Sequence, residues 1–226
     1  MDMGGLAFLG GEWVTGVSEC GGVSRGRQTA RMDASQEPDR GDRRGLKWVQ
    51  STGGPLIVVP QSSVNAWGGC TGDGSVLGDA DGRDDYDRAC EVEDLAGVIT
   101  VGAGGATALV LADEPAQTCF LPEELLFVRW LAANSEAELF EAARALLADP
   151  DTVWEDSGLW VTDGPAVLMD SAEAGDDLGA EHPDAGRPDQ APVRLPAGRW
   201  RVHAAHATDE FPWVGVVRLL AENGQD

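Results

Sequence analysis

Short apolar runs separated by turn residues recur along most of the chain. Gly53, Gly54 and Pro55 lead directly into the run Leu56–Val59, which is typical of a tight turn that opens a buried strand. The segment Trp200–His206 alternates between apolar and polar side chains, as a half-buried strand does. Runs of this kind predict strands at Leu56–Val59, Val98–Val101, Ala108–Leu111, Leu125–Leu131, Val153–Glu155, Leu159–Val161, Ala166–Asp170, Val193–Leu195, Trp200–His206 and Val214–Leu220.

One segment has the periodicity of a helix. Asn134 or Ser135 suits the N-cap, and Glu138 stands three residues after Ser135, as a capping box requires. Pro150 prevents the helix from continuing. Apolar residues fall at helical spacing between these limits, namely Leu139, Ala142, Ala143, Leu146 and Leu147. The pattern predicts a principal helix over about 135–148 and a shorter helical turn over Asp84–Glu91.

These elements predict an α+β fold, a mainly antiparallel, sandwich-like sheet with one principal helix. The length of 226 residues fits a single domain with appendages. We expect residues 1–46 to be a disordered extension or translation from a start codon upstream of the true one, because they are rich in polar residues and glycine. A single domain is expected over 47–222, with polar insertions near 69–83 and 174–190 that carry no core residues.

The charge is strongly negative and unevenly distributed. The formal net charge is −23, and residues 1–47 hold seven basic and seven acidic residues, so the rest of the chain carries the whole excess. Such a surface repels nucleic acid and anionic lipid and attracts basic proteins. Solubility alone is the simpler explanation. Because the chain has no apolar run of 18 residues and Asp2 is unlike the start of a signal peptide, we expect a cytoplasmic protein without a membrane partner.

Groups that could support catalysis are scarce. Cys20, Cys70, Cys90 and Cys119 form no CxxC pair, so we expect free thiols and no structural zinc. The chain contains no GxSxG, HExxH or P-loop motif. Cys90 and His203 could form a nucleophile and base pair if the fold brought them together. A small cytoplasmic enzyme that uses Cys90 or clustered carboxylates is therefore the alternative to a binding protein.

Two glycine-rich segments resemble known ligand-binding loops. The stretch Gly102–Ala106 resembles the start of a dinucleotide loop, but Thr107 replaces the third glycine and an apolar strand follows, so a hairpin turn is favoured. The acidic stretch from Asp73 to Asp84 resembles a calcium loop, but Leu77 stands where a fifth-position oxygen is needed. We therefore expect no cofactor and no metal.

Several motifs in order resemble the immunity protein 21 family of bacterial polymorphic toxin systems. They are Trp48, Gly53-Gly54-Pro55 with Leu56–Pro60, Trp67-Gly68, Asp85-Tyr86-Asp87-Arg88-Ala89-Cys90, Asp113-Glu114-Pro115, Val128-Arg129-Trp130, Leu195–Trp200 and Trp213-Gly215-Val217. The resemblance implies a non-enzymatic cytoplasmic protein that binds and neutralises a cognate secreted toxin in the producing cell. The acidic excess favours a basic toxin such as a nuclease.

The candidate partner-binding residues follow from the aromatic and acidic character of the third and fourth of these segments. We predict contacts from Trp67, Asp84, Asp85, Tyr86 and Asp87, with the aromatic side chains as anchors and the carboxylates as the steering charge. We predict structural roles for Gly53, Gly54, Pro55, Arg88 and Cys90, with Arg88 paired to carboxylates or carbonyls. The sequence leaves the oligomeric state open.

Overall fold

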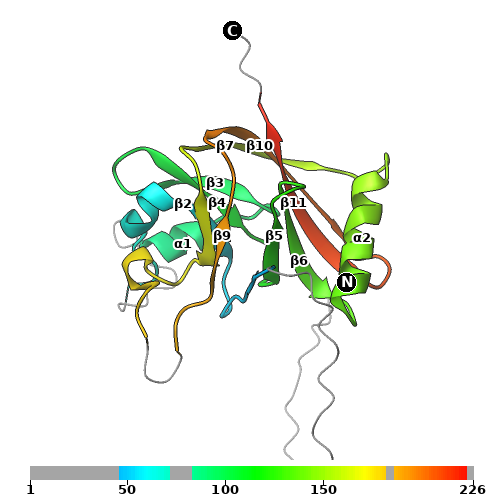
Figure 1. The fold of residues 1–226 in the computed structure, drawn as a ribbon, viewed down its shortest axis with the longest axis horizontal. Coiled ribbons are helices and arrows are strands. Elements are labelled where there is room, and N and C mark those ends of the chain that lie inside the picture. Colours follow the sequence, from blue (N-terminus) through cyan, green and yellow to red (C-terminus); the bar gives the residue numbers. More distant parts are fainter. Residues whose placement is uncertain (1–45, 72–82, 182–185, 223–226) are drawn as a thin grey trace, which may run out of the picture. The chain divides into compact units, whose positions relative to one another are not determined.

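Two antiparallel sheets pack face to face in the computed structural model, which describes residues 46–71, 83–181 and 186–222 (Figure 1). The six-stranded sheet has the order β1 (Trp48–Val49), β5 (Gln117–Leu121), β6 (Leu126–Ala132), β11 (Trp213–Ala221), β10 (Gly198–Ala207) and β7 (Glu155–Thr162). The five-stranded sheet has the order β3 (Gly97–Val101), β4 (Ala106–Leu111), β2 (Leu56–Pro60), β8 (Ala166–Asp170) and β9 (Gln190–Val193).

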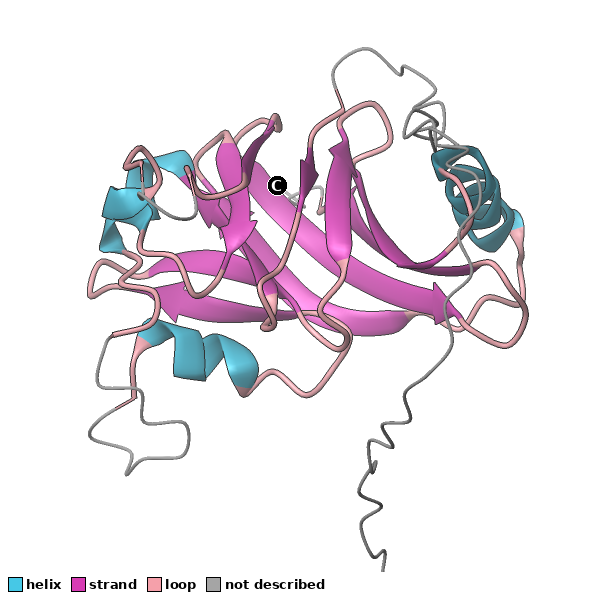
Figure 2. Ribbon diagram, turned by 90° about the horizontal axis from the view of Figure 1, so that it is seen from below, coloured by secondary structure: helices cyan, strands magenta, loops and turns pink. Residues whose placement is uncertain are grey.

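Helices cover the two outer faces of this sandwich. The helix α1 (Asp85–Cys90) and the short 3₁₀ helices η1 (Gln61–Ala66) and η2 (Gly175–Asp177) lie on the five-stranded sheet, and α2 (Glu136–Ala148) lies on the six-stranded sheet. Figures 1 and 2 show the sheets between these two helical layers. The predicted α+β, sandwich-like fold with one principal helix is confirmed.

Strand alternation produces the core between the sheets. On β10, the side chains of Trp200, Val202 and Ala204 enter this core, whereas Ala205 belongs to the cluster under α2. On β2, Leu56 and Val58 face the same core, whereas Ile57 and Val59 face the layer of α1. All four residues of the run Leu56–Val59 are thus apolar because both faces of β2 are covered.

Two side-chain hydrogen bonds join the two sheets at β7. The Trp160 indole is fully buried, and its Nε1 donates to the Thr107 carbonyl of β4 at 3.0 Å. Thr107 Oγ1 in turn donates to the Val161 carbonyl at 3.1 Å. The polar groups of two strands from different sheets therefore satisfy each other at this edge of the sandwich.

Most of the predicted elements are present, but some boundaries are wrong. The segment Val153–Glu155 is not a strand: only Glu155 belongs to β7, and Val153 is 89% exposed in the connection from α2. The strand expected at Val193–Leu195 ends at Val193 instead. The apolar pattern predicts neither β1, which has only two residues, nor β5, whose polar Gln117 and Thr118 hide its alternation.

The polar stretch near 174–190 does carry core residues. Leu178 is 6% exposed and packs in the same cluster as Trp67 and Met169, which corrects the expectation that this insertion lies outside the core. Its apolar side chain covers the outer face of the five-stranded sheet, which the composition of the surrounding residues concealed. The expectations for residues 1–45 and for most of 69–83 lie outside the described residues.

Candidate functional site

The acidic residues predicted to bind a partner lie together at the start of α1. Asp84 is the N-cap, and its Oδ1 accepts from Asp87 N at 2.8 Å, while the Asp87 carboxylate accepts from Asp84 N at 3.3 Å. Asp84 Oδ2 also accepts from Thr71 N at 2.8 Å, and Asp85 Oδ2 accepts from Gly68 N at 2.7 Å. These half-buried carboxylates therefore tie the first turn of α1 to the loop that follows η1.

These hydrogen bonds affect the ionisation of Asp84. Burial raises the pKa of its carboxyl, but the bonds from Asp87 N and Thr71 N outweigh burial and leave the pKa below its ordinary value. The carboxylate is thus charged at neutral pH. Its charge can reach a partner, although the group also has a structural role.

Trp67 lies under this acidic turn, not on the surface. Its side chain is 1% exposed, packs with Ala89 of α1, and donates from Nε1 to the Ser171 carbonyl at 3.0 Å. The glycine and polar residues around Trp67 in the sequence predict an exposed side chain that could anchor a partner. The structure corrects that expectation: the indole contributes packing and a hydrogen bond, and it presents almost no surface to a partner.

The turn Gly53-Gly54-Pro55 packs closely against Tyr86 of α1. A Cβ built at Gly54 would lie 2.6 Å from Tyr86 Oη, so only glycine leaves room for this ring. Tyr86 also interacts with the Cys90 thiol one helical turn later. Burial, together with this hydrogen bond, raises the pKa of Tyr86 to about 12.

Two residues that the sequence analysis did not select hold this corner together. Asp170 is 3% exposed, and its Oδ2 accepts from both N and Oγ1 of Thr52 at 2.7 Å. Ser171 Oγ donates to the Pro55 carbonyl at 2.7 Å. The only sequence signal was a polar pair at the end of an apolar strand. We define the α1 corner as Gly53–Pro55, Trp67, Asp84–Cys90 and Asp170–Ser171.

Arg88 makes the kind of pairing that the sequence indicated. Its Nη2 forms an ion pair with Asp85, and its Nη1 donates to the Thr100 carbonyl of β3 at 2.9 Å. Since the guanidinium bridges α1 and the edge strand, it anchors the helix to the sheet. Arg88 is therefore a structural tether within the α1 corner.

The structure separates Cys90 from His203. Cys90 ends α1 on the five-stranded sheet, whereas His203 lies on the outer face of the six-stranded sheet beside Trp154 and Arg218. Burial, together with nearby carboxylates, raises the pKa of the Cys90 thiol, which disfavours a reactive thiolate. The arrangement of these residues does not provide a nucleophile and its base.

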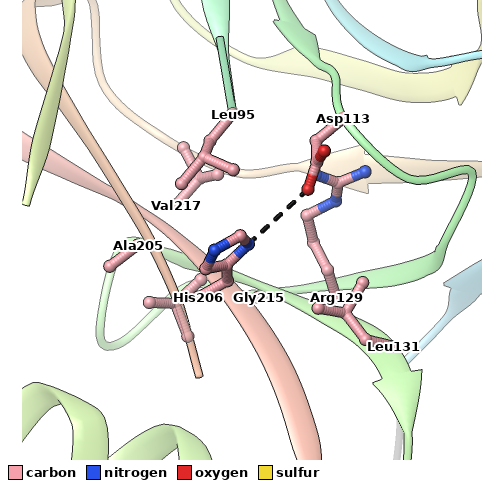
Figure 3. Close-up of a pocket in the computed structure, with 9 residues that line it drawn as sticks. Leu95, Asp113, Arg129, Leu131, Ala205, His206, Gly215 and Val217 are labelled. Carbon is pink, nitrogen blue, oxygen red and sulfur yellow. Dashed lines mark ion pairs between the residues drawn. The ribbon is translucent and has the colours of Figure 1, made fainter. Parts of the chain in front are cut away.

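A second cluster joins residues from four separate segments (Figure 3). Gly215 of β11 pairs with Arg129 of β6 on one side and with His206 of β10 on the other. Asp113, in the connection from β4 to β5, places its Oδ2 3.6 Å from His206 Nδ1. Arg129 Nη2 donates to the Glu114 carbonyl of the same connection. Arg129 and His206 therefore hold this crossover between the sheets in place.

Arg129 is an unusual member of this cluster because it is 3% exposed. Burial lowers its pKa to about 10, although the carboxylates of Asp113 and Glu114 favour the charged form. Within the described residues its Nε has no hydrogen-bond partner. The cavity beside it measures about 10 Å³, too little for a substrate, so this cluster supports the surface above it.

The motif segments noted in the sequence meet at these two places. Gly53-Gly54-Pro55, Trp67 and Asp85–Cys90 form the α1 corner, while Asp113-Glu114, Arg129 and Gly215 form the second cluster. Sequence reasoning identified the segments but could not show that they form two sites. The available signal for the second site was the presence of Asp113-Glu114, Arg129 and Gly215 among the motif segments.

Comparison with protein families decides the assignment. Residues 47–211 match the family model described as Immunity protein 21. The chain belongs to the immunity protein 21 family. Comparison with curated proteins and with solved structures gives no match.

The match covers both sites of this immunity protein 21 family member, except for one strand. Trp67, Asp84–Asp87, Asp113 and Arg129 lie inside the matched residues, whereas β11 with Gly215 follows them. Because β11 lies between β6 and β10, the sheet of this family member extends beyond the matched region. None of the helices in the described ranges is long and apolar enough to cross a membrane.

Proposed function

We propose that this chain is an immunity protein that binds a cognate secreted polymorphic toxin and neutralises it in the producing cell. The observation that carries this proposal is the family match over residues 47–211. Inhibition needs a stable surface of complementary shape and charge and no catalytic groups. The sandwich, with helices fixed to both outer faces, provides such a rigid scaffold.

Two features of the described residues support binding over catalysis. Cys90 ends α1 on the outer side of the five-stranded sheet and His203 lies on β10 of the other sheet, and the raised pKa of the Cys90 thiol keeps it protonated. The carboxylates clustered at α1 accept hydrogen bonds from backbone groups, which stabilises the helix. Both groups that the enzyme alternative would use thus have a structural explanation.

The favoured toxin is a basic protein, and a nuclease in particular. The net charge of −23 attracts positively charged surfaces and repels nucleic acid. A nuclease must carry basic residues to hold phosphates, so it offers the complementary charge. Binding would then combine electrostatic steering with burial of aromatic or aliphatic anchors.

The α1 corner remains a proposed contact surface for the charges of such a toxin. Asp84, Asp85 and Asp87 are half-buried, and Tyr86 lies between them in sequence. Trp67 would act through the packing of α1, since its indole is buried. Replacement of Asp84, Asp85 and Asp87 by Asn preserves an acceptor oxygen and removes the charge, so Asn is the appropriate test substitution.

The decisive experiment expresses the toxin domain encoded by the adjacent gene with and without this chain. We expect growth arrest by the toxin alone and rescue by the chain, and a complex of the two purified proteins. The variant Cys90→Ser should rescue growth as well as the wild type does. Failure of the wild-type chain to bind or to rescue would overturn the proposed function, and loss of rescue by a stably folded Cys90→Ser would revive the enzyme alternative.

A salt series tests the charge contribution separately. The triple change Asp84→Asn, Asp85→Asn and Asp87→Asn should slow association at low salt and leave dissociation nearly unchanged. A matched control removes three exposed carboxylates elsewhere, through Glu123→Gln, Glu124→Gln and Asp163→Asn. Thermal unfolding of each variant separates a loss of charge from a loss of the α1 cap. Equal association rates for the two triple variants would show that the α1 corner has no special part in steering.

A further inference from the structure

The hairpin between β10 and β11 exposes two aromatic side chains. Phe211 is 55% exposed and Trp213 is 43% exposed, and they are the aromatic members of the large exposed hydrophobic residues in the described ranges. The others are aliphatic: Val153, Val161 and Leu220. Single exposed apolar residues are common on protein surfaces, but two large aromatic side chains two positions apart form a larger patch.

Acidic residues precede this aromatic pair in the hairpin, and two further carboxylates lie on the connection that contacts β10. Asp209 and Glu210 are exposed in the hairpin directly before Phe211. Asp113 and Glu114 are exposed in the β4–β5 connection, which reaches the hairpin strand through the 3.6 Å contact between Asp113 Oδ2 and His206 Nδ1 (Figure 3). We define the hairpin rim as Asp113, Glu114, Asp209, Glu210, Phe211 and Trp213.

The hairpin rim has a firm base. Arg129 is buried below the crossover and donates to the Glu114 carbonyl, while Gly215 leaves the space that the Arg129 side chain occupies. These contacts restrain the loop that carries Asp113 and Glu114 before any partner binds. Restraint of this kind lowers the entropy cost of association.

We infer that the hairpin rim is a docking surface for an arginine-rich or lysine-rich face of the toxin, an inference that rests on the proposed function. Exposed aromatic rings and carboxylates suit such a face because guanidinium groups stack on rings and pair with carboxylates. Aromatic side chains carry most of the binding energy of protein interfaces, and surrounding charges set specificity and association rate. The α1 corner has the carboxylates but not the exposed indole.

Removal of the aromatic pair tests this assignment. The double variant Phe211→Ala and Trp213→Ala should raise the dissociation rate from the purified toxin domain by about 30-fold, the effect of a single strong anchor. The control Val161→Ala and Leu220→Ala removes two residues of comparable exposure, 45% and 39%, on other parts of β7 and β11. The control should bind like the wild type. Because Trp213 begins β11, the single variant Phe211→Ala is measured as well and should still raise dissociation by about tenfold.

Charge reversal and a footprint give independent readouts. Glu210→Arg changes only an exposed turn residue and should slow association at low salt by about tenfold. Hydrogen exchange on the wild-type complex should show toxin-dependent protection of the amides in 208–211. If the wild type binds and rescues growth but these variants bind normally and residues 208–211 stay unprotected, the hairpin rim is not the docking surface. If the wild type fails to bind, the proposed function itself is wrong.

Discussion

Trp160 and Trp200 face each other across β7 and β10, yet of these two indoles only that of Trp160 has a hydrogen-bond acceptor among the described residues. Both side chains are buried, at 0% and 5% exposure. Trp160 Nε1 donates to the Thr107 carbonyl of the other sheet, whereas Trp200 Nε1 has no partner among the described residues. The pair is therefore an internal comparison of a satisfied and an unsatisfied buried donor.

This difference predicts unequal costs for the same substitution. Trp160→Phe leaves the Thr107 carbonyl without its cross-sheet donor, which adds about 1–3 kcal/mol to the cost of lost packing. Trp200→Phe loses similar packing but removes an unsatisfied N–H, so it should destabilise less. Denaturant unfolding of both variants measures the difference. Equal free energies of unfolding would show that the Trp160–Thr107 bond adds nothing to stability.

A second prediction concerns Gly215. A Cβ at this position would lie 3.2 Å from Arg129 Cβ, and the buried Arg129 side chain has little room to move away. Gly215→Ala should therefore destabilise the fold by about 1–3 kcal/mol. Gly104→Ala is the control, because nothing lies within 4 Å of its added Cβ. If Gly215→Ala were as stable as this control, the neighbouring strand β11 would not fix the position of the Arg129 side chain.

Tyr86 provides a direct test of the α1 corner because the chain contains a single tyrosine. Its pKa is raised to about 12 in the folded protein, so absorbance of the tyrosinate should appear near pH 12 in the native state. In denaturant the same signal should appear near the ordinary value of about 10. A native midpoint at the denatured value would contradict the buried environment assigned to Tyr86.

The raised pKa also fixes the sign of a stability change. The unfolded chain releases the Tyr86 proton first, so the contribution of Tyr86 to stability is present below about pH 10 and is lost as the pH rises toward 12. Gly54→Ala would displace the ring, since the new Cβ would lie 2.6 Å from Tyr86 Oη. This variant should lower the native titration midpoint of Tyr86. An unchanged midpoint would show that the ring does not depend on the space above Gly54.

A fourth prediction separates packing from binding at Trp67. Trp67→Ala removes a fully buried indole and its bond to the Ser171 carbonyl, and should cost about 3–5 kcal/mol of folding stability. Any weakening of toxin binding should then result from disordered packing of the α1 corner and not from a lost direct contact with Trp67. Trp67→Phe, which keeps most of the apolar contact, should retain binding. Loss of binding by a stably folded Trp67→Phe would restore Trp67 as a direct contact.

The sequence predicts the elements of this fold better than the position of its site. Apolar runs and caps identify the strands and α2 because those signals are local, and Ser135 and Glu138 do form the expected start of the helix. Whether a side chain is exposed depends on segments that are distant in the sequence. Trp67 sits among glycine and polar residues in the sequence, yet η2 and α1 cover it from distant parts of the chain.

The same limitation explains the residues that sequence reasoning missed. Asp170 and Arg129 gain their roles only when segments more than ten residues away fold against them, Thr52 for the first and Glu114 for the second. The hairpin rim likewise depends on the crossover from β4 to β5 lying against β10. No spacing rule within one segment indicates such contacts.

The position of β11 has a consequence for synthesis. This last described strand lies between β6 and β10, and its partner β6 precedes it by some 80 residues of intervening helix and strands. A ribosome-bound chain cannot close the six-stranded sheet until β11 has emerged, and pairing over such sequence distances is slow. Under the proposed function, a chain would neutralise the toxin only after β11 has emerged and paired, so the timing of translation relative to toxin synthesis would become part of how immunity is established.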